Sequence, residues 1–146
     1  MELHLIEQKG MTPAEVGHML YNDSGLLGLS GISNDMRELL ASDQQPAAMA
    51  VEFFALRVAQ AVASLTVTLG GLDALVFTAG IGERSPQVRA RVVEPLGFLG
   101  LALDTHANDT DSLRIDTAES RVPILVIPTD EERMIGLHTL RLLRNA

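Results

Sequence analysis

The sequence predicts an α/β fold in which a few parallel strands are flanked by helices. Two short apolar runs, at residues 74–78 and 123–127, have the length and composition of buried strands. Helical patterns occupy the chain between and after them, and strands that alternate with helices pair in parallel. The length of 146 residues and the hydrophobic content of 47% suit one globular domain with a sizeable core.

Helix signals dominate the first half of the chain. Thr12 and Glu15 form a capping box with a proline between them, which predicts a helix that ends near residue 21. Residues 26–32 alternate leucines with glycines and predict a compact loop. Asp35, followed by a glutamate three residues later, indicates the start of another helix.

A long helix is predicted from Pro46 to the glycine pair at Gly70 and Gly71. Apolar residues recur along it at spacings of three and four, which is typical of a helix with one buried face. The face expected to be buried comprises Ala48, Val51, Ala55, Val58, Val62, Leu65 and Leu69.

The first strand run is followed at once by Gly80 and Gly82, which predict a two-glycine turn. Ser85 and Pro86 then predict an N-cap and the first residue of a short helix that ends near residue 95. Such a turn leaves backbone N–H groups bare for an anionic or planar ligand. An ordinary tight turn is the alternative, because a lone Gly-x-Gly pattern is common.

The last third of the chain predicts less regular structure and a final helix. Residues 97–116 are polar and irregular, with short strands expected at 101–103 and 113–116. Thr129 and Glu132 form a capping box that predicts a helix reaching residue 143 or so. The residues expected on or near its buried side are Ile135, Leu140 and Leu143.

Charge and composition disfavour several classes of protein. A net charge of −8 and a pI near 4.8 argue against a nucleic-acid or anionic-membrane partner. The absence of cysteine excludes disulfides, a thiolate nucleophile and thiolate metal sites. Glu52 and Arg57 interrupt the longest apolar run, and the N-terminus has no signal-peptide pattern. We therefore expect a soluble cytoplasmic protein without a membrane span.

Three stretches of the chain closely resemble the acetate kinase (acetokinase) family. They are SGLLGLSGISNDMREL at residues 24–39, DALVFTAGIGERS at 73–85 and VPILVIPTDEERMI at 122–135. They occur in the family's order, which makes them far more specific together than any one glycine pattern. Full acetate kinases are considerably longer, so the resemblance covers only their C-terminal portion and implies that the N-terminal domain is absent.

The resemblance also implies a fold. Acetate kinases belong to the superfamily of actin-like ATPase domains, whose halves are built on a ribonuclease-H-like mixed sheet with flanking helices. We expect residues 1–146 to form a single, incomplete domain of this type, which explains why two strong strands are few for this length. A truncated sheet exposes an unpaired edge and an apolar face, so we expect a homo-oligomer.

Two segments match residues that bind adenine nucleotide (ATP or ADP) in the family. The segment that contacts the base and ribose corresponds to Asp35, Met36 and Arg37. The nucleotide-binding turn corresponds to Gly80, Ile81, Gly82, Glu83 and Arg84. Arg84 stands where the family more commonly has Asn. A carboxylate accepts from ribose hydroxyls and a guanidinium stacks on adenine. From spacing alone, an ordinary helix cap at Asp35 with Arg37 in solvent is the preferred interpretation, and the family resemblance reverses that preference.

Glu131 aligns with a family residue associated with Mg²⁺, a cation that prefers carboxylate oxygens and completes its shell with water and substrate phosphates. The alternative is that Asp130, Glu131 and Glu132 only complement the dipole of the helix they open. The four histidines are scattered and lack metal-ligand spacing. Arg89 and Arg91, on the short helix, are expected in solvent. We assign no catalytic residue.

The resemblance implies phosphoryl transfer from ATP to acetate, giving ADP and acetyl phosphate. In the family the catalytic histidine and the substrate-side arginines precede the portion represented here. We therefore expect a nucleotide-binding part that is inactive alone, the short-chain carboxylate binding only in the full-length enzyme. Alternatives are a non-enzymatic dimerisation or interaction module, and part of a propionate or butyrate kinase.

Overall fold

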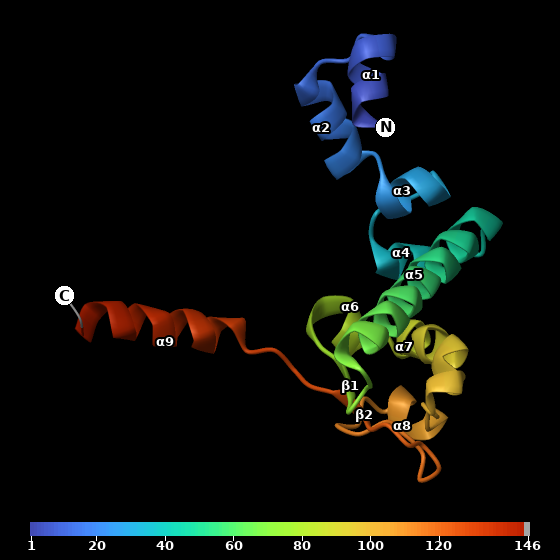
Figure 1. The fold of residues 1–146 in the computed structure, drawn as a ribbon, viewed down its shortest axis with the longest axis vertical. Helices are drawn as coiled ribbons and strands as arrows, with labels where there is room; N and C mark the ends of the chain where they lie inside the picture. The colour runs from blue at the N-terminus through green and yellow to red at the C-terminus, as the bar shows by residue number, and fades with distance from the viewer. Residues whose placement is uncertain (145–146) are drawn as a thin grey trace. The chain divides into compact units, whose positions relative to one another are not determined.

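The structure is a computed structural model that describes residues 1–144. These residues divide into two compact units, Met1–Ala61 and a second that begins at Val62. Figure 1 shows the order of the elements along the chain. The long helix α5 begins in the first unit and continues into the second, and each unit positions a different group of the predicted site residues.

The first unit is helical. Its elements are α1 (Glu2–Lys9), α2 (Pro13–Asn22), α3 (Gly25–Ser30), α4 (Met36–Leu40) and the first part of α5 (Gln45–Leu69). The capping box of α2 is confirmed, because the Glu15 amide donates to the Thr12 hydroxyl while the Glu15 carboxylate accepts from the Thr12 amide. Helix α1 was not predicted.

The loop predicted at residues 26–32 is wrong, since these residues form most of α3 and its C-terminal turn. Gly31 adopts a left-handed conformation, with φ of 65°, and donates its amide to the Leu27 carbonyl. This is a glycine C-cap, which ends a helix without a steric penalty. The alternation of leucine and glycine therefore marked a short helix and its end.

Helix α5 agrees with the predicted bounds, but only part of the predicted buried face is buried. Its buried residues are Ala47, Ala50, Val51, Ala55 and Ala59. Ala48 is exposed, and Leu65 and Leu69 are 59% and 74% exposed. The buried face is thus lined mainly by alanines, which allow a neighbouring backbone to approach closely.

By length and composition α5 is also a candidate membrane span, in contrast to the prediction. It has 25 residues, and an 18-residue window within it has a mean hydropathy of 1.5 with 22% of that window buried. Glu52 and Arg57 are too few to lower the hydropathy below that of a spanning helix. One such helix is weak evidence, because the core helix of a soluble protein passes the same test.

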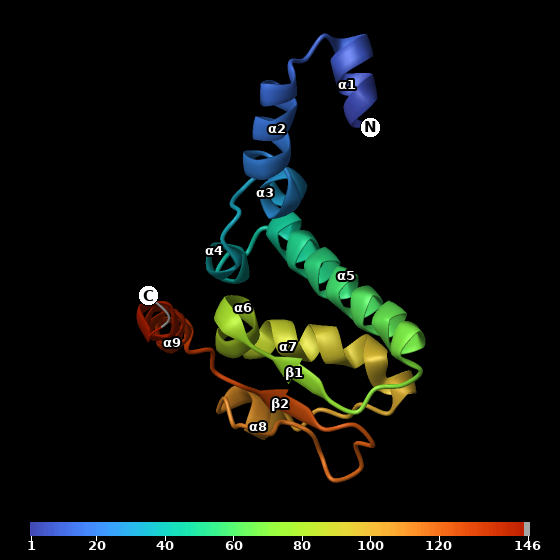
Figure 2. The same cartoon turned by 60° about the vertical axis from the view of Figure 1, so that its left-hand side comes forward.

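The second unit contains a parallel two-stranded sheet, as predicted. Strand β1 (Leu75–Phe77) pairs with β2 (Ile124–Val126), so that Val76 lies opposite Leu125. Figures 1 and 2 both show the two strands side by side. The short strands predicted at residues 101–103 and 113–116 appear only as single antiparallel bridges, from Leu103 to Asp116 and from Arg114 to Leu125.

Burial of β1 on both faces is wrong. Phe77 is buried, but Val76 is 45% exposed. Within the described residues β1 has one neighbouring strand, so its other edge is open. The alternation of buried and exposed residues is that of an edge strand with one covered face.

Helices account for most of the remaining second unit. They are α6 (Ala79–Arg84), α7 (Pro86–Val93), the 3₁₀ helix η1 (Glu94–Leu99), α8 (Thr105–Asp109) and α9 (Glu131–Arg144). The core holds Val92, Leu96, Ile115 and Ile124, each at most 1% exposed. The region predicted to be irregular therefore contains α8 and a central core residue, Ile115.

Helix α9 confirms the predicted final helix but not its buried side. No residue of α9 is buried, and Ile135, Leu140 and Leu143 are 66%, 52% and 70% exposed. Among the described residues, no element covers the apolar side chains of α9. Their periodic spacing therefore predicted a helix but not a buried face.

Two helix N-caps of this chain differ in a way that stability measurements can test. Thr12 accepts a hydrogen bond from the first turn of α2, so Thr12→Ala should destabilise that helix by about 1 kcal/mol. Ser85 also precedes a proline-started helix, but its buried hydroxyl has no hydrogen-bond partner within the part of the chain described. Ser85→Ala should therefore cost much less.

Hydrogen exchange of the first amides of α2 and of α7 measures each effect locally. Faster exchange in both variants by the same factor would contradict the distinction.

Candidate functional site

A cavity of about 430 Å³ opens at the carboxyl ends of the two parallel strands. Because β1 and β2 run in the same direction, the residues that follow them meet at one edge of the sheet, where α/β proteins commonly bind ligands. One wall begins at Ala79 and the other at Thr129. The residues that line the cavity are Ala79, Gly80, Glu83, Arg84, Thr129, Asp130, Glu131 and Glu132.

The predicted two-glycine turn is in fact the short helix α6. The chain bends at Ala79, which has φ of 56°, a left-handed conformation that is uncommon for a residue with a side chain. Gly80 and Gly82 follow within the helix, with ordinary φ values. A Cβ on Gly80 would meet no atom within 4 Å, whereas one on Gly82 would be 3.5 Å from the Phe77 backbone. Gly80 therefore leaves open space at the cavity, and Gly82 packs against the end of β1.

Glu83 joins the two walls of the cavity. Its Oε1 accepts hydrogen bonds from the Ala79 amide, from the Thr129 amide at 2.8 Å and from the Thr129 hydroxyl at 2.9 Å. The bond from the Thr129 amide is the largest cause that holds the pKa of Glu83 below its ordinary value. Glu83 is predicted to bind nucleotide, but one of its carboxylate oxygens is already committed within the protein.

The same contacts explain why the predicted capping box at Thr129 is wrong. The Thr129 hydroxyl donates to Glu83 rather than accepting from the helix. Asp130 takes its place, since Asp130 Oδ1 accepts from the Arg133 amide at 2.9 Å and α9 begins at Glu131. A hydrogen bond between residues 46 positions apart in the sequence has therefore moved the N-cap from Thr129 to Asp130.

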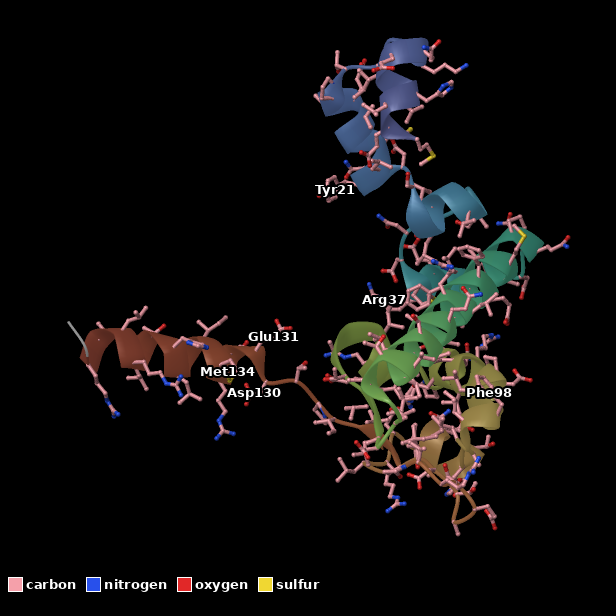
Figure 3. All side chains as sticks on the ribbon, in the orientation of Figure 1. Tyr21, Arg37, Phe98, Asp130, Glu131 and Met134 are labelled. Carbon is pink, nitrogen blue, oxygen red and sulfur yellow. The ribbon has the colours of Figure 1, made fainter. Side chains whose placement is uncertain are left out.

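The charge of the cavity is unbalanced. Four carboxylates and one guanidinium, that of Arg84, line it, which leaves three negative charges. Among the described residues no group of three or more His, Cys, Asp or Glu side chains is placed to hold a metal ion. Figure 3 shows Asp130 and Glu131 directed to different sides of the chain at the start of α9. Glu131 alone therefore offers one carboxylate, which suits Mg²⁺ only when phosphates and water supply the other ligands.

The other predicted segment lies in the first unit. Asp35 caps α4 by accepting from the Arg37 amide at 2.8 Å, and the Arg37 guanidinium donates to both Asp35 oxygens. The Arg37 side-chain hydrogen bond is the largest cause that lowers the pKa of Asp35 to about 2. Met36 is buried at 4% exposure, which leaves its backbone for any ligand contact. The helix start predicted at Asp35 is therefore confirmed. Hydrogen bonds to Asp35 also orient the exposed Arg37 side chain.

Arg89 was expected in solvent, and this expectation is wrong because its side chain is fully buried. It makes hydrogen bonds to Gly82 and Glu83 on one side and to Asn108 on the other. A signal for this burial was present in the sequence. Arg89 lies three and four residues before Val92 and Val93, on the apolar face of α7, and both valines are buried.

Comparison with known proteins agrees with the three sequence stretches. Residues 1–137 match the Acetokinase family. The chain belongs to this family. It is 55% identical over 141 residues to the acetate kinase of Rhizobium meliloti, which covers 97% of this chain and 36% of that protein. The acetate kinase of Nitrobacter hamburgensis is 52% identical, with 97% of this chain and 35% of that protein covered.

Solved structures give the same result. The acetate kinase of Porphyromonas gingivalis superposes on 95% of this chain with a TM-score of 0.85 at 33% identity, using 36% of its own length. The propionate kinase of Francisella tularensis superposes on 90% with a TM-score of 0.82 at 39% identity, using 35% of its length. This acetokinase-family chain therefore spans about 36% of the length of its relatives.

The Glu83 contacts predict a pH-dependent change at Thr129. Because the folded-state pKa of Glu83 is lowered, its carboxylate stabilises the folded chain above the pKa of an unfolded glutamate, and this stabilisation is lost as the pH falls through the folded value. The Thr129 amide resonance should titrate with that pKa, below the range of ordinary glutamates.

In Glu83→Gln this titration should disappear, and the Ala79 and Thr129 amides should exchange faster at neutral pH. A Thr129 resonance that titrates identically in both proteins would contradict the assignment. Glu119→Gln, remote from the cavity lining, is the matched control.

Proposed function

We propose that this chain is the adenine-nucleotide-binding, C-terminal part of an acetate kinase-type phosphotransferase. The observation that carries the proposal is the cavity at the ends of β1 and β2, whose walls are built from two of the three stretches that resemble the family. The reaction is transfer of a phosphoryl group between ATP and acetate. ATP or ADP and Mg²⁺ are the ligands that the family implies.

The charge of the cavity decides which part of a nucleotide it suits. Three excess negative charges repel a polyphosphate, whereas the uncharged adenosine is free of this penalty. The adenosine therefore lies against Gly80, where no Cβ blocks the backbone. Arg84 provides the one cation of the lining, and Glu131 meets the phosphates through Mg²⁺.

The first unit holds Asp35 and Arg37, which match the residues that contact ribose and base in the family. Their bidentate pairing holds the guanidinium plane in one orientation, which lowers the entropy lost when that plane stacks on an adenine. Asp35 stays ionised at neutral pH because its pKa is about 2, so it remains an acceptor for a hydroxyl.

Phosphoryl transfer depends on positioning the reactants and neutralising charge around the moving group. The cavity lining contains one arginine and no histidine, so we propose that these residues bind nucleotide and that transfer needs groups outside them. We also propose that the chain forms an incomplete domain of the ribonuclease-H-like type and that it acts in the cytoplasm. The match to a propionate kinase as well as to acetate kinases leaves the length of the acid substrate open.

Nucleotide titration tests the proposal. ATP·Mg²⁺ should shift the amide resonances of Gly80, Gly82 and Arg37, with a Kd of about 1 mM, which corresponds to about 4 kcal/mol. Gly80→Ala should weaken these shifts because its Cβ would occupy the space next to the adenosine, while leaving the fold intact.

Gly97→Ala is the matched control for that substitution. It also places a Cβ in open space, but Gly97 lies in η1 and does not line the cavity. No shift at several millimolar ATP would reject nucleotide binding. Acetyl phosphate formation by the purified chain at rates normal for a kinase would instead reject the part of the proposal that makes it inactive alone.

Self-association is a second candidate function, favoured by the uncovered apolar side chains of α9. A second copy of the chain is the proposed partner, through this helix and the open edge of β1. Light scattering should show a dimer or larger species as concentration rises. Ile135 and Leu142, one heptad apart on α9, are 66% and 74% exposed, and changing both to Glu should shift the protein towards monomer.

A wild-type chain that stays monomeric at high concentration would contradict self-association. Equal association by the double variant would show that α9 is not the contact.

A further inference from the structure

The second unit contains a buried arginine whose hydrogen bonds all lie inside the protein. Arg89 is 0% exposed. Its Nε donates to Asn108 Oδ1 at 2.7 Å, and its Nη2 donates to the Asn108 carbonyl at 2.7 Å and to Asp111 Oδ1 at 2.6 Å. Its Nη1 donates to the carbonyls of Gly82 at 2.9 Å and Glu83 at 2.7 Å.

These five bonds use every N–H donor of a guanidinium, which has five. A buried cation is costly unless its donors are satisfied, and only an arginine can make all five of these hydrogen bonds. Lysine has three donors on a single nitrogen and cannot reach partners on two sides. Asn108, 1% exposed, is itself held by a bond from its Nδ2 to the Pro86 carbonyl, at the start of α7.

The guanidinium provides hydrogen-bond partners for the C-terminal end of α6. Gly82 and Glu83 lie in the last turn of α6, where carbonyls have no partner within the helix. Both carbonyls point to Arg89 Nη1, which replaces the missing helical bonds and places a positive charge at the negative end of the helix. The backbone of Glu83 is thus fixed from within the core.

The side chain of the same residue reaches the opposite way, into the cavity. Glu83 Oε1 holds the Ala79 and Thr129 amides, so one residue joins the buried guanidinium to both cavity walls. Without Arg89, the last turn of α6 would lose its carbonyl partners and Glu83 would lose the backbone position from which it spans the cavity.

We propose that Arg89 is a positioning residue of the nucleotide site: its buried guanidinium holds the carbonyl end of α6 and thereby sets the Gly80 wall of the cavity against the Thr129 wall. This inference deepens the proposed function and rests on it for the identity of the ligand. The ligand class is the adenosine part of a nucleotide. Arg89 contacts no ligand itself and acts through Glu83.

Site-specific hydrogen exchange in the whole chain tests the positioning role without any ligand. In Arg89→Lys, the Ala79 and Thr129 amides should exchange on the order of tenfold faster, the loss expected when hydrogen bonds to a charged group are removed. The Phe77 amide in β1 and the Val126 amide in β2, which donates to the Leu113 carbonyl, should keep their protection. Arg91→Lys, two residues along the same helix, is the matched control and should leave all four unchanged.

A purely structural role for Arg89 would raise exchange at all four amides by the same factor, and this result would overturn the proposal. If Arg89→Lys does not fold, Asp111→Asn decides, because it removes one negative charge but keeps an oxygen acceptor and suits the left-handed φ of 50° at this position. It should accelerate exchange at Ala79 and Thr129 alone, by a smaller factor. Unchanged exchange at both would also overturn the proposal.

Titration of ATP·Mg²⁺ then separates the two proposals. If the wild type binds, Arg89→Lys should weaken binding on the order of tenfold and reduce the shift at Gly80, and unchanged affinity would overturn the positioning role. If the wild type does not bind, the nucleotide site fails, while the exchange result still decides whether Arg89 sets the two walls.

Discussion

The parallel pairing of β1 with β2 is the constraint on which the candidate site depends. Because the two strands run in the same direction, Ala79 and Thr129 leave the sheet at the same edge, although they are separated by fifty positions of sequence. An antiparallel pair would have put these two segments at opposite ends. The pairing is only three residues long in each strand, so it cannot by itself hold the segments that follow in one arrangement.

Two side chains add contacts that hold together the segments following this short strand pair. Glu83 bridges the two segments from the cavity side, and Arg89 holds the Glu83 backbone from the core side. One contact uses the half-buried Glu83 carboxylate, and the other uses the fully buried Arg89 guanidinium. The pH-sensitive hydrogen bond, from the Thr129 amide to Glu83, therefore lies at the cavity. The hydrogen bond that holds the Glu83 backbone, from Arg89, lies in the core. Asn108 and Asp111 connect that support to α8 and the turn after it.

Local signals in the sequence predicted much of the local structure, and non-local contacts account for several of the errors. The capping box at Thr12, the long helix that starts near Pro46 and both strands were predicted, because each depends on residues within a few positions. The cap at Thr129 was wrong because a carboxylate 46 positions away takes its hydroxyl. The spacing of Arg89 to Val92 and Val93 indicated its burial, but its hydrogen-bond partners lie on other elements and could not be predicted from α7 alone. The buried side predicted for α9 requires a covering surface that no pattern within the helix reveals.

The charges of the cavity lining agree with the proposal that it holds adenosine rather than phosphate. A site for ATP based on helix ends and glycines alone would be expected to attract phosphate, yet this lining carries an excess of carboxylates. The excess makes sense if the cavity holds the uncharged end of the nucleotide and Glu131 contributes to a cation that the phosphates share. Recognition and phosphoryl transfer are then performed by different groups of residues, because transfer needs positive charge around the moving group and this lining has one guanidinium. Under the proposed function, the cavity edge at Gly80 contacts a base and a sugar, and the Arg89 network acts on that site through geometry rather than through charge.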